Sequence, residues 1–307
     1  MFALTASAEA GPRVALTEVP EPRPSVGEAL VAVRSFSLNR GELVRLKTLE
    51  PGALTGWDVA GTVLEPAADG SGPPAGARVV GMVFPGAGWA ERVAVPTDVL
   101  AQLPDAVTFA QASTLPVAGM TALLALELGG TPIGQRVLVT GATGGVGRFG
   151  VQLAALAQAR VTALVRDAAQ AEGLHALGAH DVVTELEGEF DTIIEGVGGA
   201  TLAQALRHVA PDGTVVSFAS TDAETTFVTR EFFGRAPGAA LRGLLVFPEM
   251  RRSAGRGSTL LTRLSLLVAE GKLDCSIEHE ASWREADAAI GALLERAVTG
   301  KVVLHVD

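Results

Sequence analysis

Short apolar runs, separated by clusters of proline and glycine, fill the first 112 residues of the chain. Runs bounded in this way are typical of β-strands, and helical periodicity is scarce in this part. The pattern therefore predicts an all-β domain, a small barrel with little helix. The expected strands cover residues 29–33, 59–64, 78–83 and 92–95.

From about residue 113 onward, apolar runs alternate with segments of helical period. The central unit is a strand at 137–140, a glycine-rich turn, and a helix that carries Val146, Gly150, Leu153 and Ala157 on one face at spacings of 4, 3 and 4. Alternating strands and helices predict an α/β domain with a doubly wound parallel sheet. Further strands are expected at 161–165, 181–184, 191–195 and 214–218, and a helix at 168–177.

The turn after the strand at 137–140 fits the dinucleotide fingerprint G-x-G-x-x-G, with Ala142 in the first glycine position. A diphosphate needs free backbone N–H groups and the positive end of a helix dipole close by, and side chains in the turn would hold it away. Gly144 would let the backbone approach the diphosphate, and Gly147 would let the helix pack against the strand. An ordinary glycine turn is the alternative, but strand and helix both stand in the required order. The predicted cofactor contacts in the turn are Gly144, Gly145, Val146 and Gly147.

The end of the second strand bears on which nicotinamide cofactor is used. NAD enzymes place an acidic residue there, whereas this chain has Val165 followed by Arg166. A guanidinium can pair with the 2′-phosphate of NADPH through charge-assisted bonds. We therefore expect NADPH, with Arg166 on its 2′-phosphate. Asp167 complicates this assignment, because its carboxylate could neutralise Arg166 or repel the phosphate.

Composition narrows the class of protein. The chain has 307 residues, 48% of them hydrophobic, and a net charge of −10, which indicates a globular protein of about two domains. An acidic chain without a long basic run is a poor match for nucleic acid or an anionic membrane surface. A single cysteine, Cys275, permits no internal disulfide, and neither a leader pattern nor an apolar run of membrane-spanning length is present. A cytoplasmic protein is expected.

Five separated phrases resemble one known family. They are residues 37–42, 56–63, 88–93, 115–122 and 300–304. In this order they resemble the medium-chain dehydrogenase/reductase superfamily, and within it the zinc-free quinone oxidoreductase and enoyl reductase branch. The resemblance implies a GroES-like β-barrel catalytic domain, residues 1–112 plus 266–307, with a Rossmann nucleotide-binding domain, residues 113–265, inserted into it and the active site in the cleft. A helical face over 283–293 and a strand at 301–306 fit the closing part of that barrel.

The same resemblance assigns further site residues. It places Asn39 near the nicotinamide as the candidate catalytic residue. A tyrosine that often follows this asparagine in relatives is replaced by Val44, so that cofactor contact is missing. The cofactor contacts that the resemblance adds are Thr121, Gly196, Val197, Phe218, Ala219 and Ser220.

No catalytic metal is expected. Zinc-dependent relatives hold their zinc with a cysteine and a histidine where this chain has Asn39 and Trp57, which cannot replace those ligands. The five histidines include no pair at the i, i+4 spacing of a helical metal site, and the structural-zinc lobe of such relatives needs four cysteines.

The short-chain dehydrogenase family must also be weighed, because Thr140-Gly141-x-x-x-Gly145-x-Gly147 fits its fingerprint. That fingerprint lies near the start of its chains, not after 139 residues. Its catalysis also requires a tyrosine beside a lysine, and this chain contains no tyrosine. Both facts disfavour this family.

The last part of the nucleotide domain is hard to interpret. Residues 241–247 read as a late strand, which in relatives pairs with its copy in a second subunit, so a homodimer is expected. The basic loop 248–257 could attract an anionic thioester substrate or could simply be a solvated loop.

The predicted activity is NADPH-dependent reduction of a quinone or an α,β-unsaturated carbonyl, with a small conjugated carbonyl compound as the binding partner. Asn39 could donate a hydrogen bond to the developing enolate, and solvent is the expected proton source. The alternatives are an enoyl-thioester reductase of polyketide or fatty-acid type and a non-catalytic NADPH-binding sensor.

Overall fold

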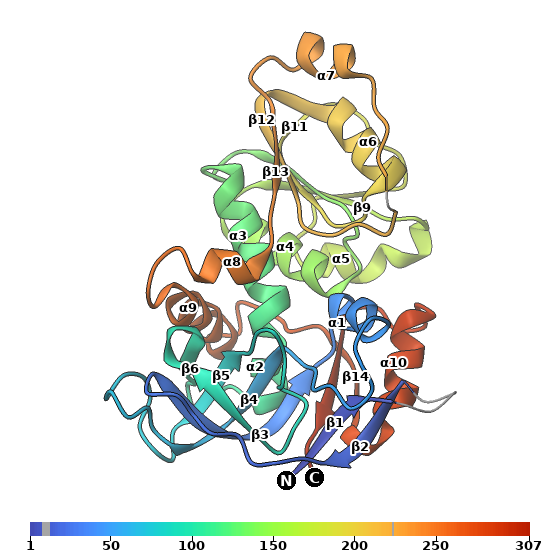
Figure 1. Cartoon of the computed structure of the whole chain (residues 1–307). Helices are drawn as coiled ribbons and strands as arrows, with labels where there is room; N and C mark the ends of the chain where they lie inside the picture. The colour runs from blue at the N-terminus through green and yellow to red at the C-terminus, as the bar shows by residue number, and fades with distance from the viewer. Residues whose placement is uncertain (8–12, 223) are drawn as a thin grey trace. The chain divides into compact units, whose positions relative to one another are not determined.

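The computed structural model describes residues 1–7, 13–222 and 224–307. Contacts between Cα atoms divide the chain into two units (Figure 1). Unit 1 comprises Met1–Met120 and Phe247–Asp307, and unit 2 comprises Thr121–Val246. The domain limits expected from the sequence, at 112/113 and 265/266, stay a prediction.

Unit 1 contains a mixed sheet of seven strands. Its order is β14-β15-β3-β4-β5-β7, and β6 also pairs with β3. Only β14 and β15 pair in parallel, and the other neighbours are antiparallel. All four strands expected at the amino end are confirmed. The seven strands are β3 (Glu28–Ser37), β4 (Asp58–Glu65), β5 (Arg78–Met82), β6 (Arg92–Pro96), β7 (Leu100–Gln102), β14 (Ile277–Ser282) and β15 (Lys301–His305). A separate antiparallel pair is formed by β1 (Phe2–Ala6) and β2 (Val14–Glu18).

Both chain ends contribute to the core of unit 1. Phe36 and Trp89 stack with ring centroids 5.6 Å apart, and Trp283 from the carboxyl-terminal segment belongs to the same buried cluster. Such an apolar cluster stabilises the sheet by removing side chains from water. The helices of this unit are α1 (Arg40–Leu46), η1 (Thr97–Val99), α2 (Phe109–Ser113), η2 (Leu115–Gly119), α8 (Val246–Met250, whose first residue belongs to unit 2), α9 (Arg256–Ala269), η4 (Trp283–Glu285) and α10 (Ala286–Leu294).

The pairing of β15 with β3 brings the end of the chain close to the start of α1. Val303 lies opposite Ser37, and Leu304 lies opposite Phe36. The Leu38 N–H also donates to Val302 O at 2.9 Å, so the pairing continues to the point where β3 leads into α1. The first residue of β15, Lys301, is thereby brought to the start of α1.

Unit 2 is built on a six-stranded parallel sheet of order β10-β9-β8-β11-β12-β13. The chain moves outward from β8 in one direction as far as β10 and then resumes on the other side at β11, which is the order of a dinucleotide-binding sheet. The predicted fold class is confirmed. The strands are β8 (Arg136–Val139), β9 (Arg160–Leu164), β10 (Asp181–Val183), β11 (Phe190–Glu195), β12 (Val209–Ser217) and β13 (Ala240–Gly243).

Helices connect the strands of unit 2. Helix α4 packs on β8 and β9, and α6 packs on β11 and β12. A second buried cluster, which includes Leu138, Ile193 and Val215, fills this unit. The helices are α3 (Met120–Gly129, which starts one residue before the unit), α4 (Gly145–Leu156), η3 (Ala168–Gln170), α5 (Glu172–Ala176), α6 (Gly199–His208) and α7 (Thr229–Arg235).

Two elements expected in unit 2 differ from the structure. The helix expected at 168–177 is two short pieces, η3 and α5, separated at Ala171, and Asp167 caps the first piece by accepting a hydrogen bond from the Ala169 N–H at 2.9 Å. The turn expected at 211–213 lies inside β12, where Asp212 has a φ of 59° and the pairing register with β11 shifts. The extra residues form a bulge that the strand absorbs.

The late strand expected at 241–247 is also shorter. Strand β13 ends at Gly243, and α8 begins at Val246. Pro248 stands at the third position of α8, within the first turn, where a missing N–H costs no intrahelical bond.

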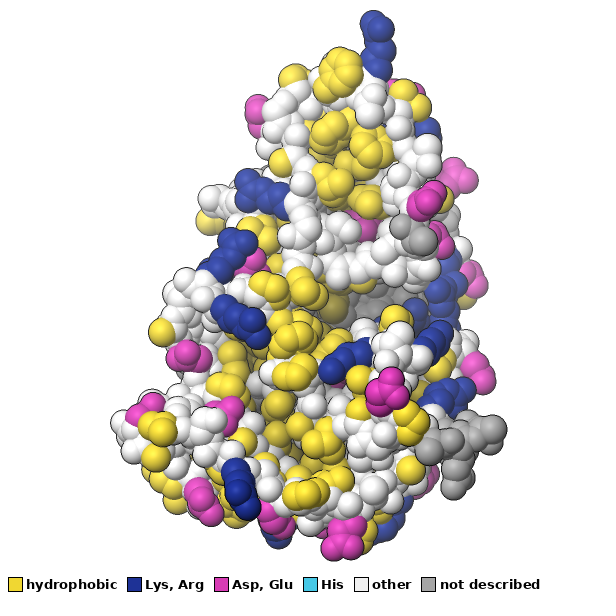
Figure 2. Space-filling view, viewed as in Figure 1, with side chains coloured by type: hydrophobic (Ala, Val, Ile, Leu, Met, Phe, Trp, Pro, Cys, Tyr) yellow, Lys and Arg dark blue, Asp and Glu magenta, His cyan; other side chains and the backbone are white. Residues whose placement is uncertain are grey.

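Charge is mixed over the surface. On the face drawn in Figure 2, basic and acidic side chains are interspersed. Within the described parts of the chain, no helix has both the length and the apolar character needed to cross a membrane.

Candidate functional site

The start of α1 is organised around Asn39 and Glu42. Asn39 is the N-cap residue, in an extended conformation, and its backbone N–H donates to Glu42 Oε2 at 2.7 Å. An acidic side chain three residues after the cap often binds the cap in this way. Gly41 lies between them, where a Cβ atom would come within 2.9 Å of the Trp57 ring.

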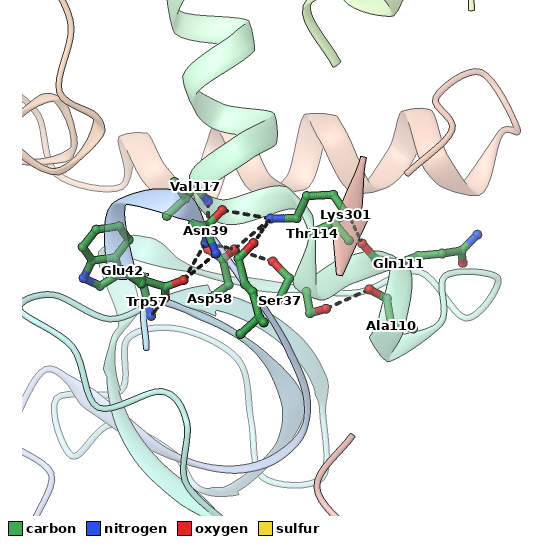
Figure 3. A network of polar contacts seen from close by, with 12 residues as sticks. Ser37, Asn39, Glu42, Trp57, Asp58, Ala110, Gln111, Thr114, Val117 and Lys301 are labelled. Atoms are coloured by element: carbon green, nitrogen blue, oxygen red, sulfur yellow. Dashed lines mark hydrogen bonds and ion pairs between the residues drawn. The ribbon is translucent and has the colours of Figure 1, made fainter. Parts of the chain in front are cut away.

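Four polar side chains meet at this point, and we call them the polar cluster: Asn39, Glu42, Asp58 and Lys301 (Figure 3). Asn39 and Glu42 come from the start of α1, Asp58 begins β4, and Lys301 begins β15. Glu42 and Asp58 are fully buried, Lys301 is 2% exposed and Asn39 is 9% exposed. Buried charges of this kind require close polar partners.

The amide of Asn39 joins the other members of the cluster. Its Nδ2 donates to Asp58 Oδ2 at 2.7 Å and to Glu42 Oε2 at 3.2 Å. Its Oδ1 accepts from Lys301 Nζ at 2.8 Å. Lys301 Nζ also donates to Leu38 O at 3.1 Å and lies 3.8 Å from Asp58 Oδ2.

Neighbouring groups satisfy the two carboxyls further. Asp58 Oδ2 accepts from Ser37 Oγ at 2.6 Å, and Asp58 Oδ1 accepts from the Val117 N–H at 2.9 Å. Glu42 Oε1 accepts from the Trp57 N–H at 2.6 Å. The cluster is therefore hydrogen-bonded on every side, as a buried polar network must be to be stable.

Burial dominates the protonation of the cluster. Burial and the nearby Asp58 charge raise the pKa of Glu42 to about 8, despite the N–H groups of Trp57 and Asn39 that favour its ionised form. Burial also raises the pKa of Asp58, although Lys301 opposes the change, and burial lowers the pKa of Lys301 against the pull of both carboxyls. One ammonium for two carboxyls makes a proton on Glu42 favourable at neutral pH.

Aromatic rings adjoin the polar cluster through Trp57. The Trp57 ring packs edge-on against Phe247 with centroids 4.8 Å apart, and Phe84 stacks on Phe247 at 4.4 Å. Phe84 is 47% exposed, and the Arg251 guanidinium lies 5.9 Å from its ring centroid. The segment 248–257, expected as a loop, includes the end of α8 and the start of α9, and the turn between these helices places Arg251 beside an accessible ring.

In unit 2, the fingerprint turn has the geometry that its glycines imply. A Cβ on Gly147 would lie 2.3 Å from Gly141 O, so only glycine lets α4 pack this closely on the turn. Gly144 is exposed, and the single atom near its ideal Cβ is Gly141 O at 3.3 Å. The first N–H groups of α4, at Gly145, Val146 and Gly147, lie in the turn of the helix that leaves backbone donors without intrahelical partners.

A buried carboxylate organises the neighbouring strand end. Glu195, the last residue of β11, is fully buried, and its Oε1 accepts from the Val197 N–H at 2.8 Å and the Gly198 N–H at 2.9 Å. Thr140 Oγ donates to the same oxygen at 3.2 Å, and Ser217 Oγ donates to Oε2 at 3.3 Å. Glu195 therefore ties together the ends of β8, β11 and β12, at the point where strand order reverses and ligands of such sheets bind.

The other predicted cofactor residues of the central strands lie at this same edge. Gly196 follows β11 where a Cβ would come within 2.5 Å of the Phe218 ring, and a Cβ on Gly198 would lie 2.0 Å from Ser220 Oγ. Ala219 and Ser220 are exposed, and Thr121 is buried in α3. The loops that follow β11 and β12 are thus in contact with each other.

Arg166 follows the end of β9 and is exposed. The carboxylate of Asp167 turns away to cap η3 through the Ala169 N–H. No ion pair joins Arg166 to another residue in the described segments. Its guanidinium is therefore available to an anionic ligand.

Unit 2 also has a cavity of about 690 Å³, which lies away from the predicted cofactor residues. Its lining includes Arg136, Arg160, Asp181 and Phe190, which begin β8, β9, β10 and β11. None of the predicted cofactor residues lines it, because they follow the opposite, carboxyl ends of the strands.

Known proteins resemble this chain over almost its whole length. The family described as zinc-binding dehydrogenase matches residues 174–304. A chloroplast envelope quinone oxidoreductase homolog of Arabidopsis thaliana is 28% identical, over 94% of this chain and 92% of that protein. The solved quinone oxidoreductase of Coxiella burnetii is 28% identical with a TM-score of 0.83, over 100% of this chain and 99% of that one. The polyketide synthase protein NorB of Streptomyces orinoci is 30% identical over 91% of this chain, which spans only 13% of NorB.

The chain is similar over almost its whole length to proteins of the zinc-binding-dehydrogenase-like, medium-chain dehydrogenase/reductase superfamily. It matches the quinone oxidoreductase and enoyl reductase branch of this superfamily. The family resemblance predicted from the five sequence motifs is confirmed.

The matching family is described as zinc-binding. The residues at the start of α1 and β4 in this chain, however, do not suit a zinc ion. Trp57 stands where the sequence resemblance expects a zinc ligand, and its indole packs against Phe247 and donates through Nε1 to Pro85 O at 3.1 Å. The Asp58 carboxyl of the polar cluster already has Lys301 as counter-ion. Over the described ranges, no three His, Cys, Asp or Glu side chains are grouped to hold a metal. The lone Cys275 is buried, and burial raises the pKa of its thiol to about 12.

Sequence reasoning missed the roles of Lys301 and Glu195. In the sequence, each is only a charged residue beside an apolar run. Lys301 precedes Val302–Leu304, and Glu195 follows Ile193 and Ile194. A charge in such a place is a signal of a buried polar site, since unpaired charges are rarely buried. The partners, however, are distant in sequence and could not be named.

Proposed function

We propose that this protein is an NADPH-dependent oxidoreductase that reduces a quinone or another α,β-unsaturated carbonyl compound by hydride transfer without zinc. The observation that carries the proposal is the polar cluster. It contains Asn39 and adjoins Trp57, the two positions where the sequence resemblance expects zinc ligands, and its Asp58 carboxyl is already bonded by the Asn39 amide and paired with Lys301. Such a site has no free ligand set for a Lewis-acid metal.

The proposed cofactor site is the carboxyl edge of the sheet in unit 2. The turn before α4 offers N–H groups for a diphosphate, and Arg166 offers a guanidinium for a 2′-phosphate. When bound, NADPH would supply the hydride. The loops after β11 and β12, which include Gly196, Val197 and Phe218, would contact the rest of the cofactor.

The proposed contribution of the chain itself to the reduction is orientation of the reactants. It contains no tyrosine to act as an acid, and the carboxyls of the polar cluster are fully buried. We therefore propose that solvent protonates the enolate, and that Asn39, the most exposed member of the cluster, takes part by holding the reactants.

A second candidate function is an enoyl-thioester reductase. The similarity to NorB, a polyketide synthase protein, favours it, and so does the position of Arg251 beside an exposed ring, where an anionic thioester carrier could bind. A non-catalytic NADPH-binding role is the third. A cytoplasmic location without nucleic-acid or membrane partners remains part of the proposal.

We also propose a homodimer. Strand β13 is the edge of the sheet in unit 2, and the exposed Leu241 (46%) and Leu245 (57%) lie on and just beyond it. An edge strand with exposed apolar side chains readily pairs with another strand. Light scattering should find a dimer at micromolar concentration, and a monomer there would contradict this part of the proposal.

The deciding experiment is oxidation of NADPH by chelator-treated protein with a simple quinone, a medium-chain enone and an enoyl thioester, with NADH in parallel. Turnover that survives chelation and is faster with NADPH supports the proposal, and the best acceptor identifies the branch. Activity lost on chelation and restored by zinc would overturn it. Tight NADPH binding without turnover of any acceptor would favour the non-catalytic role.

A further inference from the structure

The side-chain amide of Asn39 has little freedom left to contact a ligand. An amide NH₂ has two hydrogens, and here both are used, on Asp58 Oδ2 at 2.7 Å and on Glu42 Oε2 at 3.2 Å. The carbonyl oxygen has two acceptor positions. It accepts one hydrogen bond, from Lys301 Nζ at 2.8 Å, while the backbone N–H of Glu42 faces it in the capping box of α1 without forming a side-chain cap hydrogen bond. The unused capacity of Asn39 is therefore that of an acceptor.

The charges around Asn39 decide which way its amide points. A flipped amide would set its NH₂ group against the Lys301 ammonium and its carbonyl against the Asp58 carboxylate. Both contacts would change from attraction to repulsion in a fully buried site, where electrostatic interactions are strong. Lys301 is the only cation among the groups bonded to this amide (Figure 3).

We infer that Lys301 is a positioning residue, which fixes Asn39 so that its carbonyl oxygen accepts a hydrogen bond from a bound ligand. The inference rests on the proposed reductase function and changes one part of it. Asn39 would bind an N–H or O–H group of the cofactor or substrate, and it would not donate to the developing enolate. The enolate must then be stabilised by solvent or by other donors.

The Asn39 side chain can be observed selectively by NMR, because Asn39 is the only asparagine in the chain. Protein labelled with [¹⁵N]asparagine will show a single side-chain NH₂ pair. In the wild type we expect both hydrogens to exchange slowly with solvent, because both are bonded to buried carboxyls.

The decisive comparison is made in a Glu42→Gln background, which adds no second asparagine. Removing Lys301 alone would leave buried carboxyls without a counter-ion and could prevent folding. Glu42→Gln keeps Lys301 and Asp58, so the Asn39 amide should stay oriented and its hydrogens protected. Adding Lys301→Met should raise their exchange rate at least about tenfold and lower kcat by about tenfold, the value of one charge-assisted hydrogen bond. Lys272→Met, which changes an exposed lysine paired with Glu270, is the matched control and should alter neither measurement.

The outcomes separate the inference from the proposed function. Equal protection and equal kcat in the single and double variants would overturn the positioning role of Lys301. If the double variant is too unstable to study, Lys301→Gln in the same background tests the same point. Glutamine keeps a hydrogen-bond donor but not the charge, and unchanged Asn39 signals and kcat would again overturn the inference. A wild type that reduces no acceptor would defeat the proposed function, yet the amide signals would still report on Lys301.

Discussion

Lys301 Nζ lies 2.8 Å from Asn39 Oδ1, although 262 residues separate the two along the chain. The contact exists because β15 pairs with β3, whose end leads directly into α1. It joins the two segments of unit 1 through a charged hydrogen bond in the buried interior. Such bonds are shorter and stronger than neutral ones, so the contact fixes the geometry of the polar cluster.

Stability should depend on pH through Glu42. Its pKa is about 8 in the folded protein and 4.5 in the reference state, so the folded state binds the proton more tightly than the unfolded chain. The free energy of unfolding should therefore fall as pH rises from about 4.5 to about 8, by up to about 1.4 kcal/mol per pH unit, and the raised pKa of Asp58 acts in the same sense. Urea unfolding between pH 5 and 8 measures this slope.

Glu42→Gln should flatten that dependence, because an amide cannot titrate. The exposed Glu187→Gln is the matched control and should leave the slope unchanged. A wild type whose stability rises over the same interval would show that Glu42 is ionised in the folded state at neutral pH.

Cofactor preference should depend on Arg166. Replacing it with alanine removes the guanidinium proposed to pair with the 2′-phosphate, at a cost of about 1.5–3 kcal/mol, or roughly tenfold to a hundredfold in the Kd of NADPH. The Kd of NADH should stay nearly constant. Titrating nucleotide fluorescence for both cofactors tests this, with the exposed Arg230→Ala as control. An unchanged ratio of the two Kd values would remove Arg166 from the cofactor site.

Gly147→Ala should damage the fingerprint turn. The added Cβ would lie 2.3 Å from Gly141 O and 2.7 Å from Ala142 Cα, so α4 must move away from the turn. Overpacking of this kind costs about 1–3 kcal/mol and should also weaken nucleotide binding. Gly173→Ala in α5, where nothing lies within 4 Å of the new Cβ, should be neutral or slightly stabilising. Thermal unfolding with and without NADPH compares the two variants, and equal behaviour would refute the packing argument.

Glu195 should support cofactor binding without touching the cofactor. Glu195→Ala would leave the Val197 and Gly198 N–H groups without their acceptor, at about 1–3 kcal/mol for each buried group, and should weaken NADPH binding about tenfold. Glu195→Gln keeps an oxygen for both N–H groups and can donate to Ser217 Oγ, so it should restore binding. Calorimetric titration of the two variants measures this, and a glutamine variant as weak as the alanine variant would show that the charge itself matters.

Local patterns predicted the parts of the fold that depend on neighbouring residues. The strands of both units and the turn Ala142–Gly147 follow from periodicity and glycine placement, which act over a few residues. The single helix expected at 168–177 was wrong, since the structure divides it at Ala171 into η3 and α5. The strand expected up to residue 247 was wrong because α8 starts at Val246.

The candidate site was less predictable, because its contacts join distant segments. Asn39 and the turn glycines could be identified from the resemblance and the fingerprint. The partners of Asn39 depend on strand pairing, which places Asp58 and Lys301 beside it. Glu195 likewise acquires its role from Thr140 and Ser217 on neighbouring strands. No short-range pattern contains that information.

The order of the units along the chain also bears on how the protein folds during synthesis. Unit 2 is one continuous segment, Thr121–Val246, whereas unit 1 is interrupted by it. Translation proceeds from the amino end, so the nucleotide-binding sheet can form on the ribosome before residues 247–307 exist. The first 120 residues are synthesised well before β15, so Glu42 and Asp58 lack the Lys301 cation until the end of unit 1 is made.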